Sequence, residues 1–404
     1  MKTPRIAIVS FPGNNGEVES MSVIRRVGME PVFFRWNDDR AILKDVDGYF
    51  IPGGFSYEDR GRSGMVAARD PLMEFIASEA EEGKVVIGIC NGAQILVESG
   101  LIPNGQNLQM CLARNAITTK DGVRGLPLLS EWIWITPSCS KDRCATSNWE
   151  GVMQIPIAHG EGRFTTQDKD LMEELKKNDQ IAFSYCDAEG KISEDPVVTP
   201  NGSMLAIAGV CNPQGNVIAL MPHPERAPGN GDAYFASMKS WLMKSRTSKK
   251  SMISKKDVDA PVTLPVRSVQ NPEIFIETII TNNEERTVEQ AARRIAPSLR
   301  LKQWKYLCVP EKQVKAVLAD LTLFNANKER AFIKQGNDGT EFIGKRTVLI
   351  RRDIPDTGAA SLGQGTETGI AYGIEGISEQ ELCSIKLLEV FANPHASVLE
   401  RLSV

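Results

Sequence analysis

The chain has 404 residues, which is too long for one ordinary hydrophobic core and predicts two domains of unequal size. Its 47 basic and 51 acidic side chains nearly balance, so bulk charge gives no reason to expect binding to nucleic acid or membranes, and no apolar run approaches the roughly 20 residues that span a bilayer. Eight cysteines without repeated close pairs indicate the reduced thiols of a cytoplasmic protein.

The first part of the chain alternates between short apolar runs and helical segments. The apolar runs predict strands of a sheet that is buried on both faces, and they cover residues 5–11, 31–36, 48–52, 84–89 and 216–222. The helical segments have apolar residues at helical spacing, and they cover residues 18–27, 71–82 and 232–243. This alternation predicts an α/β domain over residues 1–243, with a doubly wound, mostly parallel sheet.

A polar, basic stretch without periodicity follows over residues 244–261. We expect a solvated linker there, with a basic docking patch as the alternative. Residues 262–404 mix strand-like and helical patterns and predict a small α+β domain of two similar halves. Its strands are expected at 274–280, 304–309 and 346–351, and its helices at 288–295 and 311–321. Near its end, Ser378 and Glu381 have the spacing of a capping box, which predicts a further helix.

The strongest local signal for chemistry is Cys90, which follows an apolar strand and directly precedes a helical segment. Gly88 and Gly92 flank it in the pattern G-x-C-x-G, a cysteine form of the nucleophile elbow. The positive end of the following helix favours the thiolate over the thiol, which makes Cys90 a candidate nucleophile. A buried structural cysteine is the alternative for this segment alone.

A thiolate that attacks an amide needs donors for the developing oxyanion. The backbone amide of Asn91 is one candidate donor, and Gly54 offers another because the Gly53–Gly54 pair follows a predicted parallel strand. Both segments are then expected at the carboxyl edge of the sheet, where open α/β sheets bind ligands. The backbone at Gly53 can come close to the substrate there.

A second signal, Met221-Pro-His223-Pro-Glu225-Arg226, also follows an apolar strand. Pro224 favours an extended conformation at His223, and residues two apart in an extended segment point the same way. Glu225 can then orient the imidazole and stabilise its protonated form. Cys90, His223 and Glu225 together predict a catalytic triad. Cys139 and Cys144 are the nearest cysteine pair, but with three histidines in the chain no metal site is expected.

The stretches around Gly53, Cys90 and His223 together resemble the class I, triad-type glutamine amidotransferases. More narrowly, the chain resembles the glutaminase subunit of phosphoribosylformylglycinamidine synthase over residues 5–243, in segments 11–15, 53–57, 90–92, 114–115, 156–162 and 221–226. The resemblance implies that Gln94 and Asn115 contact the substrate glutamine. The sequence departs from the family after Asn115, where Ala116-Ile-Thr-Thr stands, and at Gly16-Glu17. His159 lies in the most discriminating run, either at the partner interface or as a structural histidine.

The second domain resembles the small bridging subunit of the same synthase, or the related N-terminal segment of its large subunit, in residues 348–356, 376–382 and 391–394. His395 beside the last of these segments is interpreted as incidental. The resemblance implies that the chain supplies ammonia to an ATP-dependent synthetase subunit that makes formylglycinamidine ribonucleotide in purine synthesis. The chain has no Walker A loop, so we expect no cofactor on it and place ATP and Mg²⁺ on the partner.

Two rival functions follow from the same motifs. One is an amidotransferase of the same fold that serves a different acceptor. The other is a non-catalytic protein, in which Cys90 is a redox sensor or the domain regulates a partner. His223 and Glu225 argue against the sensor, because a sensor needs no proton shuttle.

Overall fold

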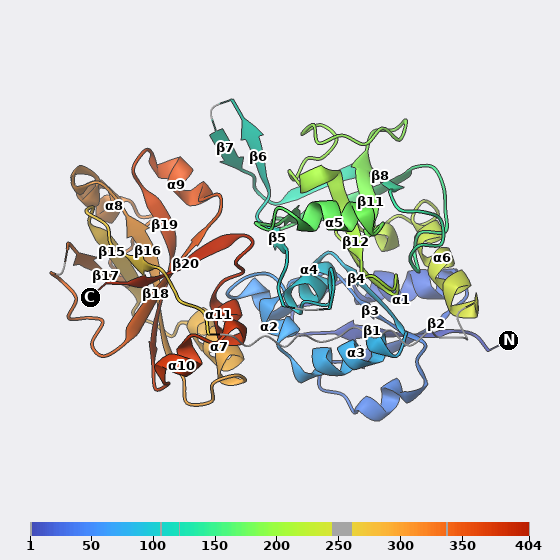
Figure 1. The fold of residues 1–404 in the computed structure, drawn as a ribbon, viewed down its shortest axis with the longest axis horizontal. Helices are drawn as coiled ribbons and strands as arrows, with labels where there is room; N and C mark the ends of the chain where they lie inside the picture. Colours follow the sequence, from blue (N-terminus) through green and yellow to red (C-terminus); the bar gives the residue numbers. More distant parts are fainter. Residues whose placement is uncertain (1, 106, 121, 245–260, 337, 404) are drawn as a thin grey trace. The chain divides into compact units, whose positions relative to one another are not determined.

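The computed structural model describes residues 2–105, 107–120, 122–244, 261–336 and 338–403 (Figure 1). The chain forms two compact units. The first comprises Met1–Thr118 and Leu126–Asp257, and the second comprises Thr119–Gly125 and Val258–Val404. Almost all of the predicted linker, residues 245–260, lies outside the described residues. No helix in the described ranges is both long and apolar enough to cross a membrane.

A nine-stranded sheet forms the centre of the first unit, and five neighbouring strands in it are parallel. In sheet order these are β2 (Glu30–Arg35), β1 (Arg5–Ser10), β3 (Gly48–Ile51), β4 (Val85–Ile89) and β13 (Val217–Leu220). They correspond to the five apolar runs, and the predicted α/β fold class is confirmed. Four further strands extend the sheet with antiparallel pairing: β12 (Ile207–Cys211), β11 (Ile181–Cys186), β8 (Leu129–Pro137) and β9 (Met153–His159).

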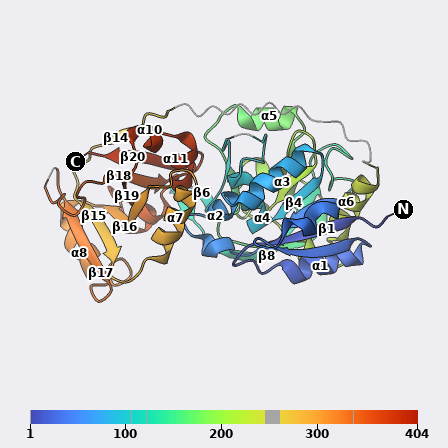
Figure 2. The same cartoon turned by 90° about the horizontal axis from the view of Figure 1, so that it is seen from below.

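Helices cover both faces of the parallel strands. The connection β1–α1–β2 runs toward one edge of the sheet and β3–α3–β4 runs toward the other, so right-handed crossovers place α1 and α3 on opposite faces (Figure 2). The predicted helices are α1 (Glu17–Arg26), α3 (Pro71–Glu81) and α6 (Asp232–Lys244). The other helices of the unit are α2 (Met65–Ala68), α4 (Asn91–Glu98) and α5 (Leu171–Lys177), and its short strands are β5 (Cys111–Ala113), β6 (Ala116–Thr119) and β10 (Arg163–Thr165). Strand β7 (Gly122–Gly125) belongs to the second unit.

The second unit contains a seven-stranded sheet with an internal repeat. Its order is β14 (Val266–Arg267), β20 (Ser397–Leu402), β18 (Thr347–Asp353), β19 (Glu367–Glu375), β16 (Arg300–Cys308), β15 (Glu273–Thr278) and β17 (Glu329–Lys334). In the first half β15 lies between β16 and β17, and in the second half β18 lies between β19 and β20. The halves join where β16 and β19 pair antiparallel. This order contains the two similar halves that the sequence predicts.

The helices of this unit are α7 (Asn283–Arg293), α8 (Val314–Ala319), α9 (Thr357–Leu362), α10 (Glu379–Leu382) and α11 (Ile385–Phe391). Helix α7 begins five residues before the predicted start at 288, because the Asn282 side chain accepts from the amide of Glu285 and caps the helix there. The capping box of Ser378 and Glu381 is confirmed at the start of α10. Strands β14, β17, β19 and β20 were not predicted.

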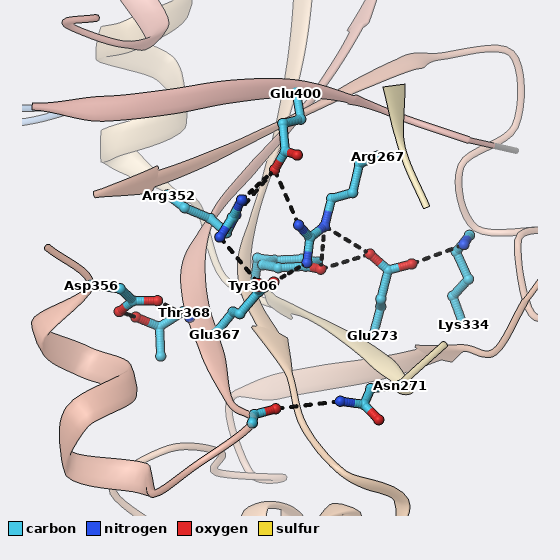
Figure 3. Close-up of polar contacts among 11 residues, drawn as sticks. Arg267, Asn271, Glu273, Tyr306, Lys334, Arg352, Asp356, Glu367, Thr368 and Glu400 are labelled. Atoms are coloured by element: carbon cyan, nitrogen blue, oxygen red, sulfur yellow. Dashed lines mark hydrogen bonds and ion pairs between the residues drawn. The ribbon is translucent and has the colours of Figure 1, made fainter. Parts of the chain in front are cut away.

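An ion network, buried at Arg267, Glu273 and Lys334 and partly exposed elsewhere, connects the strands of the second unit (Figure 3). Arg267 lies at its centre, where it donates to the Tyr306 hydroxyl at 2.8 Å and pairs with Glu400 at 3.1 Å, Glu273 at 3.4 Å and Glu367. Lys334 pairs with the other oxygen of Glu273 at 2.9 Å. Arg352 bridges Glu400 and Glu367 at 2.8 Å and 3.2 Å. Three cations thus face three carboxylates, so the network is neutral and each buried charge has a partner.

Replacing Glu273 with glutamine should strongly destabilise the second unit. The change keeps the side chain's shape but leaves Arg267 and Lys334 buried without their shared carboxylate, a loss of about 3–5 kcal/mol. Hydrogen exchange of the β15 and β16 amides in the full chain measures it. Glu379→Gln is the matched control, because Glu379 pairs with Arg401 at the surface and its loss should cost less than about 1 kcal/mol. Equal exchange in the two variants would contradict the prediction.

Candidate active site

Cys90 lies at a sharp turn between β4 and α4. Its backbone has φ 54° and ψ −110°, an uncommon conformation for a residue with a side chain. The turn depends on the two flanking glycines. A Cβ on Gly92 would lie 1.9 Å from the carbonyl oxygen of Ile51, and one on Gly88 would lie 2.4 Å from that of Gly92. The chain therefore makes the predicted elbow, with Cys90 at the carboxyl end of β4 and directly before the amino end of α4.

His223 and Glu225 follow β13 and contact each other. The His223 Nδ1 and Glu225 Oε1 atoms are 2.5 Å apart, and both side chains are buried. The backbone amide of His223 donates to the carbonyl of Pro156 on β9 at 2.9 Å. Only His223 is near an extended conformation, because residues Pro224–Arg226 form a 3-10 turn. The predicted contact is present, but a tight turn makes it rather than the extended segment that we expected.

The electrostatics of His223 favour its protonated form. Burial alone would lower the pKa of the imidazole, but the negative charges of Glu225 and Cys90 outweigh burial and raise this pKa to about 10. Nδ1 contacts Glu225 Oε1, and a side-chain hydrogen bond with Cys90 also contributes to the raised pKa. Gly53 lies between the two side chains, since a Cβ there would be 2.8 Å from His223 Cε1 and 3.4 Å from Cys90 Cβ. Cys90 and His223 therefore share one small site.

The Gly53–Gly54 peptide is held from one side by the loop after β1. The Gly53 carbonyl accepts from the amides of Asn15 at 3.3 Å and Gly16 at 3.2 Å, and from the Asn14 side chain at 3.2 Å. In a trans peptide the next N–H points opposite to the carbonyl, so the Gly54 N–H points away from this loop. A Cβ on Gly54 would lie 2.6 Å from Asn14 Cα, which explains why glycine stands there.

The Asn91 side chain organises the start of α4. Its Oδ1 accepts from the amide of Ser56 at 3.0 Å, and its Nδ2 donates to Gln94 Oε1 at 2.9 Å and Asp59 Oδ1 at 3.2 Å. These contacts tie the helix to the segment after Gly54. The hydrogen bonds of the Asn91 side chain therefore fix the segment that contains the Gly54 amide relative to the helix start that contains the Asn91 amide.

Gln94 and Asn115 both bind the loop that follows β9. Gln94 Nε2 donates to the carbonyl of Glu161 at 2.5 Å, and Asn115 Nδ2 donates to that of His159 at 2.8 Å. Asn115 Oδ1 also accepts from the amide of Gly162 at 3.1 Å. The two side chains therefore position this loop, and the glutamine contacts expected of them stay a prediction.

Sequence reasoning missed the carboxyl group of Asp59 at this site. Burial and the nearby charge of Glu161 raise its pKa to about 7, although a hydrogen bond with Ser63 opposes the shift. Tyr57, Glu58 and Asp59 have φ angles of 51°, 57° and 53°, so three successive side-chain-bearing residues adopt the left-handed conformation. Asp59 could have been predicted as a site residue because it lies close in sequence to the Gly53–Gly54 pair.

Comparison with known proteins places this geometry in a family. The model of the CobB/CobQ-like glutamine amidotransferase domain matches residues 3–251. Phosphoribosylformylglycinamidine synthase subunit PurQ of Methanothrix thermoacetophila is 40% identical over 261 residues, which are 60% of this chain and 100% of that protein. The chain belongs to this amidotransferase family. The PurQ subunit of Thermomicrobium roseum is 41% identical over 228 residues, 55% of this chain and 87% of that protein.

A solved structure gives a further match. A chain in the structure of PurLQS from Thermotoga maritima is 31% identical, with a TM-score of 0.46, and the match covers 60% of this chain and 100% of that chain. The amidotransferase family model ends at residue 251. The assignment of the second domain to a bridging subunit therefore stays a prediction.

Proposed function

We propose that the chain is the glutaminase component of a phosphoribosylformylglycinamidine synthase, with Cys90, His223 and Glu225 as its catalytic triad. The observation that carries the proposal is the pairing of His223 with Glu225 beside an elbow cysteine in a chain 40% identical to a PurQ subunit over that subunit's full length. In this reaction the chain hydrolyses glutamine and passes the ammonia to a synthetase that makes formylglycinamidine ribonucleotide. We infer that the reaction belongs to purine synthesis in the cytoplasm.

The site's geometry supports a two-step reaction. The Cys90 thiolate attacks the side-chain amide carbon of glutamine, and the His223 imidazolium gives a proton to the nitrogen as the C–N bond breaks. Ammonia leaves, and a glutamyl thioester remains on Cys90. Water then attacks the thioester carbon and gives a proton to His223, and the C–S bond breaks to return the thiolate. The sum is glutamine and water to glutamate and ammonia.

The amides of Gly54 and Asn91 are the proposed donors to the oxyanion in both steps. The Gly54 N–H points away from the loop that holds the Gly53 carbonyl, and the elbow places the Asn91 amide directly after the nucleophile. The backbone at Gly53 forms the wall between Cys90 and His223. Glu225 holds the imidazole by Nδ1, which leaves Nε2 for proton transfer.

The decisive experiment combines this chain with the large synthetase subunit from the same organism. With formylglycinamide ribonucleotide, ATP and Mg²⁺, which we assign to the partner, glutamine should support formation of the amidine, and glutamate should appear in equal amount. Other acceptors that amidotransferases serve should give no product. Glutamate release without amidine formation would indicate a different acceptor.

We further propose that the second unit docks on the synthetase. Deleting residues 262–404 should leave basal glutamine hydrolysis within about twofold but abolish its stimulation by the nucleotide-loaded partner, since the catalytic residues all lie in the first unit. Glutamate release with and without the partner measures both quantities. If the partner stimulated glutamine hydrolysis by the truncated chain as strongly as by the full chain, the proposed docking role would be wrong.

A further inference from the structure

The last residue of β9 and the loop after it, residues 159–162, are fixed at every position. Its successive carbonyls accept from Asn115 Nδ2, the Asn115 backbone amide, Gln94 Nε2 and Asn201 Nδ2, at 2.8, 2.8, 2.5 and 2.8 Å. The donors are buried side chains and a backbone amide from distant parts of the first unit. Such a loop holds the side chains that it carries in one place.

The imidazole of His159 is the unexplained group on this loop. The side chain is buried, at 3% exposure, and neither Nδ1 nor Nε2 has a hydrogen-bond partner among the described residues. Its ring lies against Gly162, where a Cβ would be 2.2 Å from Cε1. A buried polar atom without a partner costs roughly 1–3 kcal/mol, and a structural histidine ordinarily has at least one partner.

His159 also lies beside the proposed catalytic centre. The carbonyl of the preceding residue, Ala158, is 3.7 Å from Cys90 Sγ. Two residues before Ala158 on the same strand, the Pro156 carbonyl accepts from the His223 amide. The end of β9 thus passes both Cys90 and His223. A positive charge on His223 disfavours a second positive charge on His159.

The surroundings of the His159 ring favour its neutral form. Burial and the nearby His223 lower the pKa of His159 to about 3. A neutral imidazole offers one N–H donor and one acceptor nitrogen. Those two groups match a small neutral molecule that both donates and accepts, such as water or ammonia. An imidazolium would instead give its proton to ammonia and retain it as ammonium.

We propose that His159 is a positioning residue that holds the small neutral molecule of the reaction beside His223, first the departing ammonia and then the water that attacks the thioester. This inference rests on the proposed glutaminase function. His159 takes no proton in either step; its two nitrogens orient the molecule. Without it, thioester formation proceeds but hydrolysis of the thioester lacks an oriented water.

The test compares two variants of the full chain. His159→Phe keeps a ring of similar size against Gly162 but removes both polar nitrogens, whereas His159→Gln restores a donor and an acceptor. In rapid-mixing experiments with glutamine, His159→Phe should release its first ammonia at a rate near that of the unchanged protein. Its glutamate release should be slower by about tenfold or more, and a thioester should accumulate on Cys90 in mass spectra. His159→Gln should recover most of the rate.

Tyr234→Phe is the matched control, because it also removes a buried polar group of the first unit, one that forms no hydrogen bond with Cys90, His159 or His223 among the described residues. Both rates should stay unchanged in this variant. Equal slowing of ammonia and glutamate release in His159→Phe, with no thioester, would show a merely structural role and overturn the proposal. So would unchanged rates.

A second measurement uses the unaltered protein and does not depend on folding of a variant. The chain has three histidines, so ¹⁵N-labelled histidine gives few signals to assign. Adding ammonium chloride at a pH where free ammonia is present should shift the ring signals of His159 but not those of His395. A His159 signal that does not move overturns the proposal. If the unaltered chain hydrolyses no glutamine while this signal still shifts, the proposed function fails and the small-molecule site stands.

Discussion

Replacing Cys90 with alanine should abolish glutamine hydrolysis, with a loss of at least about 10⁴-fold, because no other group can form the thioester. Synthesis of the amidine from added ammonia by the complex should stay within about twofold, since only the ammonia source is removed. The measurement is amidine formation by the complex with glutamine and, separately, with ammonium chloride. Loss of both activities together would mean that Cys90 has a structural role.

The other cysteines supply the control. Burial raises the pKa of Cys186 to about 11, and the pKa of Cys139 is raised by a hydrogen bond with Cys144 and by burial, so these thiols stay protonated at neutral pH. Cys139→Ala should therefore leave hydrolysis unchanged. Electrophilic glutamine analogues should label Cys90 alone among the eight cysteines. Labelling at Cys139 would count against the elbow as the reactive site.

The five parallel strands could be predicted from the sequence because they read as apolar runs, and β1, β3, β4 and β13 are buried while the edge strand β2 is mostly exposed. The antiparallel strands could not. Strand β9 alternates buried and half-buried residues and contains Pro156, which an edge strand tolerates because one side of its backbone is unpaired. In β8, Trp132 is exposed. Such mixed patterns do not separate strands from loops, so β8 and β9 were missed. The buried strands β11 and β12 were also missed, which makes four of the nine strands of the sheet.

The proposed catalytic residues could be found because each lies in a short motif directly after an apolar strand. The residues that position them could not. Gln94 and Asn115 bind carbonyl groups 67 and 44 residues away, and a backbone carbonyl leaves no mark in the sequence of either partner. The unpartnered nitrogens of His159 likewise depend on what surrounds the ring. Sequence therefore predicted the groups proposed to react, and the structure was needed for the loop beside them.

His223→Ala should lower turnover with glutamine by about 10⁴-fold, because the amide nitrogen then leaves without a proton and water attacks without a base. Glu225→Gln should lose roughly 10- to 100-fold less, since glutamine can still accept from Nδ1 and orient the ring. Steady-state glutamate release measures both. Near-normal turnover in His223→Ala would remove the triad from the mechanism.

The dependence of activity on pH distinguishes an effect of the negative charge of Glu225 from an effect of its hydrogen bond to the imidazole. The partners of His223 raise its pKa from about 6.5 to about 10, so they stabilise the folded protein. This stabilisation is fully present below pH 6.5 and is lost as the pH rises through 10. Activity that needs the imidazolium should decline over the same upper range. Glu225→Gln removes one of the negative charges that raise this pKa, so the alkaline decline should move to lower pH, whereas an uncharged orienting role would leave it in place. Glu19→Gln is the matched control, because Glu19 also lies near Arg226, 4.0 Å from its Nε, but is not one of the charges that raise the pKa of His223.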